Sequence, residues 1–262
     1  MTWTYFFRRL IKNPSYYCLA KVDAKSLNEF LNKLVSDCLD ELFKSKCITI
    51  HDEGQINSTL LGYLSSYYYI FYKTAYYFEM TLKAGLEVNT LIEILSEATE
   101  FDGLPVRHNE EDLNEELSKI CPFEVNHLHL DSPHVKANIL LQAYFSRAPL
   151  SISDYYTDLQ TVIDNCIRII LFMIDIAGEK GFLDTSINLI ILMQMVLQGV
   201  WIYDSSIMTL PDFGIEEVMK LKNKKGICHL PELIEEKENL ESIMKQCDIK
   251  LNVSVNYITY YL

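Results

Sequence analysis

Between residues 64 and 210, apolar residues recur at helical spacing in one segment after another, and Gly or Pro separates the segments. A helix with an apolar stripe must bury that stripe against a neighbour, so such a series predicts a helical bundle. The chain has only 9 Gly and 7 Pro in 262 residues, and 49% of its residues are hydrophobic. This composition favours a mainly α fold with a sizeable core. The expected helices span residues 88–100, 110–120, 133–146, 154–180 and 185–202.

A tyrosine-rich helix is expected to open the bundle. Its aromatic residues are Tyr63, Tyr67–Tyr69, Phe71, Tyr72 and Tyr76–Phe78. Because these positions follow helical faces, we expect the rings to pack in the core and not to form a base-stacking platform.

The least charged segment of the chain is Thr185–Tyr203, which contains no Asp, Glu, Lys or Arg. Its Asn188, Gln194 and Gln198 would be costly in lipid. We therefore expect a buried central helix here and no membrane partner.

Residues 1–63 are expected to begin with two helices. The first is predicted over Thr4–Ile11, and Asn13-Pro14 would end it. The second is predicted to begin at Ser26, with Glu29 completing a capping box.

A small hairpin should follow these helices. Cys47–Ile50 predicts one strand, residues 51–55 a turn, and Leu60–Leu64 the returning strand. Two helices and a hairpin resemble the C-terminal half of a winged helix, so residues 1–63 are interpreted as a partial winged-helix segment.

The residues after the bundle predict a helix–hairpin–helix over 211–246. Its helices would span Glu216–Lys222 and Leu230–Lys245. Phosphate-gripping hairpins are rich in glycine, whereas this one has only Gly226, so we expect a structural hairpin.

Residues 247–262 predict the first strand of an incomplete β-sandwich. Apolar and polar residues alternate from Ile249 to Val255, and a lone strand cannot satisfy its own backbone. Met1 opens almost directly onto a helix. Both ends therefore predict that the chain is part of a larger polypeptide.

Charge and thiol content limit the classes of partner and compartment. The net charge is −13, yet residues 1–50 hold eight basic and five acidic side chains, whereas residues 51–150 hold six and fifteen. A free nucleic-acid binder normally has a basic surface, and only the first fifth of this chain leans that way. Seven scattered Cys without a Cys-x-x-Cys pair predict reduced thiols, in the nucleus or cytosol.

No catalytic, cofactor-binding or metal site is predicted in this chain. The sequence lacks the Gly-x-x-x-x-Gly-Lys-[Ser/Thr] loop and the Asp-Glu-x-His box that hold nucleotide and magnesium, so we do not expect it to hydrolyse ATP. The spacing of Cys121, His127, His129 and His134 matches no standard zinc pattern. The acidic run that begins at Glu110 lies at the start of a predicted helix. There its negative charges interact favourably with the helix dipole, and we expect the side chains on a solvent-exposed face and not in a catalytic site.

The helix predicted over 154–180 has two contrasting sides. Opposite its apolar side runs a stripe of Thr161, Asp164, Asn165, Arg168, Phe172, Asp175 and Glu179. Asp164 precedes Arg168 by four residues, which predicts an ion pair within the helix.

Five blocks in fixed order resemble a known family. They are Ser65–Ile70, Leu104–Glu111, Asp131–Arg147, Leu192–Trp201 and Asp204–Pro211. Together they resemble the Sec-sixty-three homology region that follows the motor domains of large two-cassette Ski-two-like helicases.

Further blocks indicate a branch of this family. Tyr5–Ile11, Asp131–His134 and Cys228–Ile234 are most similar to the second cassette of the cointegrator and ribosome-quality-control helicases. The spliceosomal U-five helicases are the neighbouring branch, and they share the features at residues 13–17 and 107–112.

The resemblance implies a non-catalytic accessory region of an ATP-dependent RNA or DNA helicase. ATP and magnesium would bind the parent's motor domains, and these domains would be partners of this region. The helix over 154–180 would line the strand channel, with Asn165, Arg168 and Phe172 at nucleic-acid contact positions. Other implied partners are cointegrator-complex or ribosome-associated subunits and single-stranded RNA or DNA. Implied processes are ribosome-associated quality control, transcription coactivation and alkylation repair.

Two alternatives stay open at this point. The acidic middle of the chain favours an interaction scaffold without nucleic-acid contact, and the spliceosomal branch would place the region in pre-mRNA splicing. The translocation protein that gives the region its name would need membrane spans and a His-Pro-Asp motif, and the sequence has neither.

Overall fold

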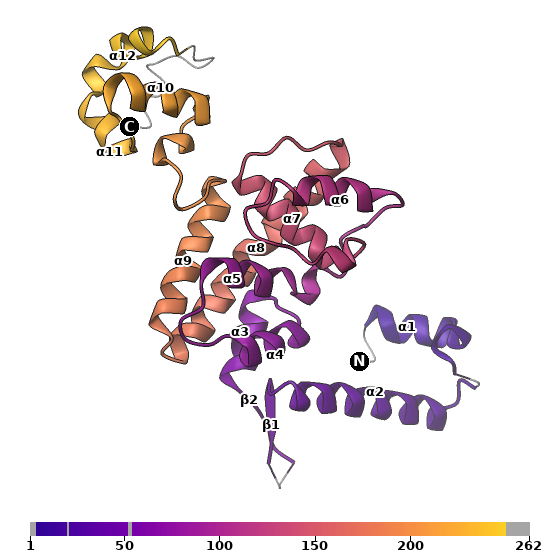
Figure 1. Cartoon of the computed structure of the whole chain (residues 1–262). Helices are drawn as coiled ribbons and strands as arrows, with labels where there is room; N and C mark the ends of the chain where they lie inside the picture. Colours follow the sequence, from indigo (N-terminus) through magenta and orange to yellow (C-terminus); the bar gives the residue numbers. More distant parts are fainter. Residues whose placement is uncertain (1–3, 20, 52–53, 250–262) are drawn as a thin grey trace. The chain divides into compact units, whose positions relative to one another are not determined.

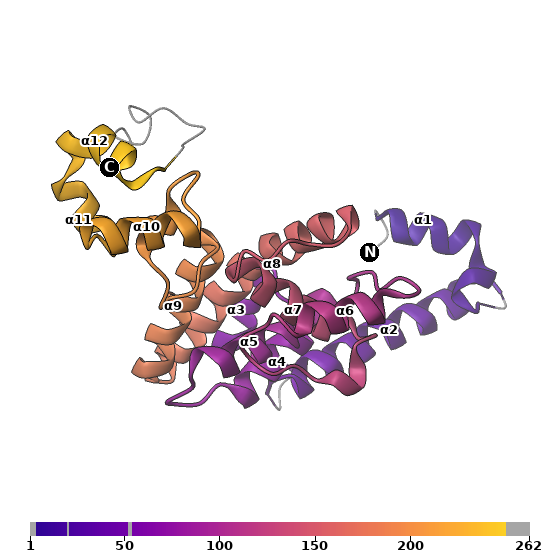
Figure 2. The ribbon, with the colours of Figure 1, turned by 45° about the horizontal axis from the view of Figure 1, so that its top comes forward.

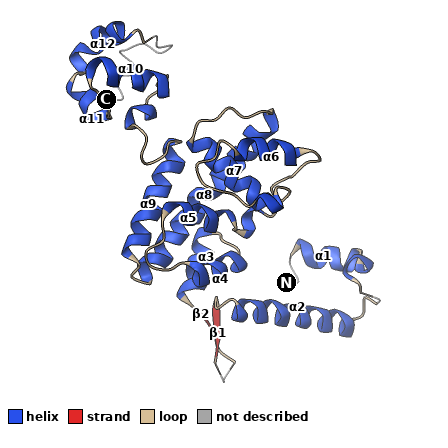
Figure 3. Ribbon diagram, in the orientation of Figure 1, coloured by secondary structure: helices blue, strands red, loops and turns tan. Residues whose placement is uncertain are grey.

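The fold is mainly α-helical, as predicted, with one two-stranded sheet in the part of the chain that the structure describes (Figure 3). The structure is a computed structural model, and it describes residues 4–19, 21–51 and 54–249 (Figure 1). The chain divides into two compact units, Met1–Met80 and Thr81–Leu262. The finer division at residues 63, 210 and 246 stays a prediction.

The first unit contains two helices, a hairpin and two more helices. Its elements are α1 (Tyr5–Lys12), a 3-10 turn (Pro14–Tyr17), α2 (Ala24–Lys44), β1 (Ile48–Ile50), β2 (Ile56–Ser58), α3 (Leu60–Tyr68) and α4 (Tyr72–Thr81). The strands are antiparallel, with Ile48 opposite Ser58. Thr4 is the N-cap of α1 and not its first residue, and Asn13 ends the helix, as the sequence predicts.

The N-cap of α2 is Asp23 and not Ser26. The Asp23 carboxylate accepts a hydrogen bond from the Ser26 backbone N–H at 2.7 Å, and the helix begins at Ala24. Both residues are good caps, but the earlier one gains a longer helix. The predicted start at Ser26 was therefore wrong.

The segment Leu60–Leu64 is helical and not the returning strand that we expected. Thr59 caps α3: its hydroxyl accepts from the Gly62 N–H at 3.0 Å and donates to the Lys46 carbonyl at 2.7 Å. The returning strand is the earlier Ile56–Ser58. An N-capping threonine before an apolar run is the signal that favours a helix here.

The expected tyrosine-rich helix is two helices, and much of it is exposed. Tyr69 ends α3 with a left-handed backbone (φ 60°), and α4 begins at Tyr72. Tyr67 is 67% exposed and Tyr69 87%. Phe78 is fully buried, so the prediction that these rings pack in the core holds for Phe78 and was wrong for Tyr67 and Tyr69. The break at Tyr69 ends the single helical face on which the prediction rested.

Gly62 is predicted to be indispensable to the first unit. A Cβ at this position would lie 2.0 Å from the Cys47 carbonyl oxygen, which is backbone and cannot rotate away. We expect Gly62→Ala to lower the free energy of unfolding by about 1–3 kcal/mol, measured by urea denaturation. Gly178→Ala is the matched control: nothing lies within 4 Å of its new Cβ, so it should stabilise the protein by about 0.5–1 kcal/mol. Equal effects of the two substitutions would contradict the steric argument.

The second unit is a helical bundle followed by short helices. Its helices are α5 (Val88–Ser96), α6 (Glu110–Ser118), α7 (Pro133–Phe145), α8 (Ser153–Glu179), α9 (Leu183–Gln198), α10 (Ile215–Lys225), α11 (Leu230–Glu235) and α12 (Leu240–Cys247). Short 3-10 turns occupy Thr99–Phe101, His127–His129, Ser206–Thr209 and Lys237–Asn239. The long helix α8 packs on α7 and, most extensively, on α9 (Figure 2).

Helix α7 lies at the centre of the bundle. The side chains of Val135, Ile139, Leu140 and Phe145 are buried, and Tyr144 is partly buried. Val135, Ile139 and Leu140 belong to a core that also contains Leu117 of α6 and Tyr155 of α8.

Helix α9 is only half buried. Leu189 and Leu192 face the core, but Leu183, Ile190 and Leu197 are exposed, so the expected fully buried helix was wrong. Within the described residues, none of the helices is both long and apolar enough to cross a membrane.

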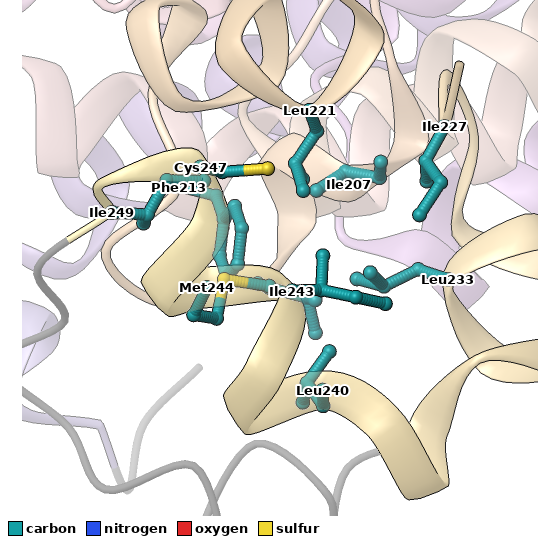
Figure 4. Close-up of a cluster of buried hydrophobic side chains, with 11 residues drawn as sticks. Ile207, Phe213, Leu221, Ile227, Leu233, Leu240, Ile243, Met244, Cys247 and Ile249 are labelled. Carbon is teal, nitrogen blue, oxygen red and sulfur yellow. The ribbon is translucent and has the colours of Figure 1, made fainter. Parts of the chain in front are cut away.

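The short C-terminal helices enclose an apolar cluster of their own (Figure 4). Phe213, Leu221, Leu233 and Met244 are among its side chains. The helix expected over Leu230–Lys245 is broken, since α11 ends at Glu235 and α12 begins at Leu240.

Gly226 follows α10 in the left-handed region (φ 74°), and its N–H donates to the Lys222 carbonyl. A helix-ending glycine of this kind has a structural role. The terminal strand expected from residue 249 onward lies almost wholly outside the described residues.

Candidate functional site

Helix α8 presents one apolar and one polar side, as its sequence predicts. Val162, Cys166, Ile169, Ile170, Met173 and Ala177 are buried. Thr161 and Asp164 on the opposite side are exposed, and Asn165 and Arg168 are half-buried.

Asn165 and Arg168 form a hydrogen-bonded pair on this polar side. The Arg168 guanidinium donates to Asn165 Oδ1 at 2.6 Å, and Asn165 Nδ2 donates to the Thr161 carbonyl at 2.9 Å. Asp164 instead accepts from Gln160 Nε2 at 2.7 Å. Arg168 thus bonds to the Asn165 amide, while the predicted partner Asp164 bonds to Gln160. A fixed arginine next to an amide can recognise a phosphate.

Phe172 does not share the polar side. Its exposed fraction is 0%, so its ring is part of the core in this structure. We expected Phe172 to continue the stripe because it follows Arg168 by four residues. Burying the large apolar surface of an aromatic ring is favourable, and this free energy determines the location of Phe172 more strongly than its position in the stripe does.

A cluster of buried charges joins α6, α7 and α8. Lys136 of α7 is fully buried, and its Nζ lies 2.6 Å from Glu110 Oε2, 2.7 Å from Asp158 Oδ2 and 2.7 Å from the Pro105 carbonyl oxygen. Three donors of the ammonium group thus meet three oxygen acceptors.

Arg107 closes the cluster from its half-buried edge. Its Nη1 lies 2.9 Å from Glu110 Oε1 and 2.7 Å from Asp158 Oδ2, and its Nε lies 3.1 Å from Asp154 Oδ2. The two carboxylates that face Lys136 are therefore shared with a second cation. We name Arg107, Glu110, Lys136 and Asp158 the buried ion cluster.

Hydrogen bonds keep both carboxylates of the buried ion cluster ionised. Burial opposes ionisation of Glu110, but hydrogen bonds from Lys136 and Arg107 outweigh it and lower its pKa. The pKa of Asp158 is lowered in the same way, against the effect of burial. Hydrogen bonds to Asp158 and Glu110 raise the pKa of Arg107.

The hydroxyl of Tyr155 adds a neutral neighbour to the cluster. Lys136 Nζ lies 4.9 Å from the centre of its ring, and its hydroxyl donates to Asn114 Oδ1 at 2.7 Å. Burial raises the pKa of Tyr155, and the charges of Glu110 and Asp158 add to this effect. The phenol of Tyr155 therefore stays neutral. It acts as a hydrogen-bond donor to Asn114 and not as a group that transfers protons.

The acidic residues Glu111, Asp112, Glu115 and Glu116 are exposed, as expected for a solvated face. Glu110 is the exception, because only 2% of its surface is exposed. It lies at the first position of α6, where its carboxylate turns back to accept the Arg107 N–H at 3.1 Å. The sequence contains one signal of this cluster: Lys136 lies between the apolar residues Val135 and Ala137. A lysine between core residues is rarely buried without a carboxylate partner.

The lowered pKa values predict a loss of stability in acid. A carboxylate whose pKa is lower in the folded state stabilises the fold above its unfolded pKa, and this contribution disappears as the pH falls. The ordinary values are 4.5 for Glu110 and 3.8 for Asp158. We expect the urea midpoint to fall as the pH decreases below about 4.5. The fall should be less steep in Glu110→Gln, because this variant has lost one of the two carboxylates that take up a proton. Identical pH profiles would exclude Glu110 as a source of the loss.

The residues of the zinc-like sequence pattern have other partners. His134 lies 3.0 Å from Asp102 Oδ1 and 2.9 Å from the Ser96 carbonyl, and Cys121 donates to the Leu117 carbonyl. Burial raises the pKa of Cys121 to about 12, so this thiol is not a reactive thiolate. Among the residues that the structure describes, no three His, Cys, Asp or Glu side chains come together as a metal site would require.

Arg147 lies beside a cavity of about 240 Å³ that Tyr144, Tyr156 and Gln198 also line. Its guanidinium donates to the carbonyl oxygens of Gly199, Met208 and Phe213. An arginine that is satisfied by three carbonyls fixes the connection after α9 and does not serve as an anion site.

Comparison with known proteins identifies relatives of the whole region. Residues 58–259 match the Sec63 Brl domain family, and residues 1–52 match a winged helix-turn-helix domain. Activating signal cointegrator 1 complex subunit 3 is 46% identical in Homo sapiens over 88% of this chain and 47% identical in Mus musculus over 81%. The U5 small nuclear ribonucleoprotein 200 kDa helicase of Homo sapiens is 34% identical over 98% of the chain.

These relatives are much longer proteins. The chain spans about a tenth of their length, namely 10% of the two cointegrator subunits and 12% of the U5 helicase. The matches include both branches that the sequence blocks indicate. The chain belongs to the Sec63 Brl domain family, whose match covers residues 58–259.

Proposed function

We propose that this chain is a non-catalytic accessory region of an ATP-dependent helicase, and that α8 lines the channel for a single strand of RNA or DNA. The observation that carries this proposal is the Asn165–Arg168 pair on the polar side of the 27-residue helix α8. The relatives named as helicases contain the same family region. The bundle would close one wall of the channel, and Arg168 would hold a phosphate between motor steps.

The proposed setting follows the more similar relatives. Partners would be the motor domains of the parent helicase and the subunits of a cointegrator or ribosome-associated complex, in the nucleus and cytosol. The proposed processes are ribosome-associated quality control, transcription coactivation and alkylation repair. The parent's motor domains would bind ATP and magnesium.

Reversing the charge of Arg168 tests the channel role. We expect Arg168→Glu to weaken binding of a fluorescent oligo(U) by about tenfold at about 50 mM salt, because a charge-assisted phosphate contact is replaced by repulsion. Fluorescence anisotropy of the full chain measures this. Lys119→Glu, the same charge change at the C-cap of α6, is the control and should cost less than about twofold, since Lys119 is paired with Glu115 and does not belong to the polar side of α8. Unchanged affinity of Arg168→Glu would remove Arg168 from the channel.

A second candidate function is an interaction scaffold without nucleic-acid contact. The exposed apolar side chains of α9 favour it, because they recur at spacings of four, three and seven residues, as in helix–helix seams. These side chains are Leu183, Ile187, Ile190 and Leu197. Co-purification with the motor region of the human relative tests it. Under this alternative, Ile190→Asp should abolish co-purification and Arg168→Glu should leave it intact.

A further inference from the structure

The exposed face of α1 concentrates positive charge in an otherwise acidic protein. Tyr5, Arg8, Arg9 and Lys12 lie at positions i, i+3, i+4 and i+7, which places them on one side of the helix. All four are exposed, whereas Leu10 on the opposite side is fully buried. The sequence has no Asp or Glu before Asp23, so no acidic side chain of this segment neutralises these cations.

Tyr16 extends this face beyond the helix. It lies in the 3-10 turn after α1, and the Arg9 guanidinium stacks over its ring at 4.6 Å from the ring centre. Tyr16 is 63% exposed and Tyr5 is 80% exposed. A stacked guanidinium keeps its N–H donors at the edge of the plane, where they can reach a phosphate.

Helix stability accounts for only part of this arrangement. Arg9 and Lys12 lie in the last turn of α1, where cations offset the partial negative charge of the helix end. Arg8 lies before that turn, and the two exposed rings gain nothing from the dipole. Cations that alternate with exposed aromatic rings are the combination that proteins use to hold single strands, because phosphates meet the cations and bases stack on the rings.

We propose that Tyr5, Arg8, Arg9, Lys12 and Tyr16, here named the α1 basic face, bind single-stranded nucleic acid. The three cations contact successive phosphates, and the two tyrosines stack on bases. RNA and DNA share both features, so the face accepts either. This site lies in the first unit and does not depend on the role proposed for α8 in the second.

Anisotropy titrations of the full chain with fluorescent oligo(U) and oligo(dT) test the proposal. In the Arg168→Glu background, where the three cations of the α1 basic face are the proposed phosphate contacts, the logarithm of the binding constant should fall with the logarithm of salt concentration with a slope of about −2. Arg8→Glu with Arg9→Glu should reduce the magnitude of this slope by about 1.4 and lower affinity at least tenfold. Tyr5→Ala should lower affinity about fivefold and leave the slope unchanged, and Tyr5→Phe should restore it.

The control is an equal charge change elsewhere in the first unit. Lys33→Glu with Lys44→Glu reverses two exposed lysines of α2 and should leave the slope unchanged. The effects of the α1 variants should persist in the Arg168→Glu background, which separates this face from the channel. The proposal is overturned if the α1 and α2 variants behave alike. It is also overturned if poly-glutamate binds as tightly as oligo(U) without any effect of Tyr5→Ala, since the face would then recognise acidic protein.

Discussion

Lys136→Met is expected to lower the free energy of unfolding by about 3–5 kcal/mol. The side chain of Lys136 has no exposed surface, and it contacts the carboxylates of Glu110 and Asp158. Methionine fills much of the same volume but leaves Arg107 as the remaining cation for two buried negative charges. The loss therefore comes from unpaired charge and not from a cavity.

Urea denaturation followed by circular dichroism measures this effect near pH 7. Lys119→Met is the matched control, and it should change stability by less than about 0.5 kcal/mol because its ion pair with Glu115 is exposed. Combining Lys136→Met with Glu110→Gln removes one of the stranded charges and should recover part of the loss. If Lys136→Met alone lowers the free energy of unfolding by less than about 1 kcal/mol, then Arg107 is sufficient to compensate the charges of both carboxylates, which would contradict the argument.

Trp201→Ala is expected to cost about 3–5 kcal/mol, the range for truncating a large buried aromatic side chain. Trp201 follows α9 and is 97% buried, with 3% of its surface exposed. Its ring meets Phe123 and Phe145 edge to face, with ring centres 5.3 and 5.1 Å away, and its Nε1 donates to Ser146 Oγ at 2.9 Å.

Trp201→Phe separates packing from hydrogen bonding. It keeps an aromatic ring and loses the indole donor, so it should cost clearly less than Trp201→Ala in the same urea titration. Equal losses for the two variants would show that the indole N–H, and not the ring, is the important group.

The helices were predictable because apolar periodicity and strong breakers are local signals. Pro133 begins α7, and Asn13 ends α1, where the sequence indicates. The errors arose where two local signals compete within a few residues. Asp23 and Ser26 are both caps, and Thr59 converts an apolar run that resembles a strand into a helix.

The candidate site was only partly predictable, because contacts between distant segments leave no periodic signal. Arg168 lies on the polar side of α8 as expected, since spacing alone determines this side. Phe172 and Glu110 are buried instead of exposed, because the exposure of each side chain depends on the residues that pack against it. Glu110 meets Lys136 and Asp158, residues that lie in other helices, and only the folded chain brings them together.

The buried ion cluster restricts how this region can evolve. A buried charge is stable only while its partners remain. A single substitution of Lys136, Glu110 or Asp158 therefore gives a less stable protein. Homologous chains should therefore retain all three residues or exchange them together for an uncharged set. The three positions, separated in sequence but adjacent in space, should vary in concert across the family.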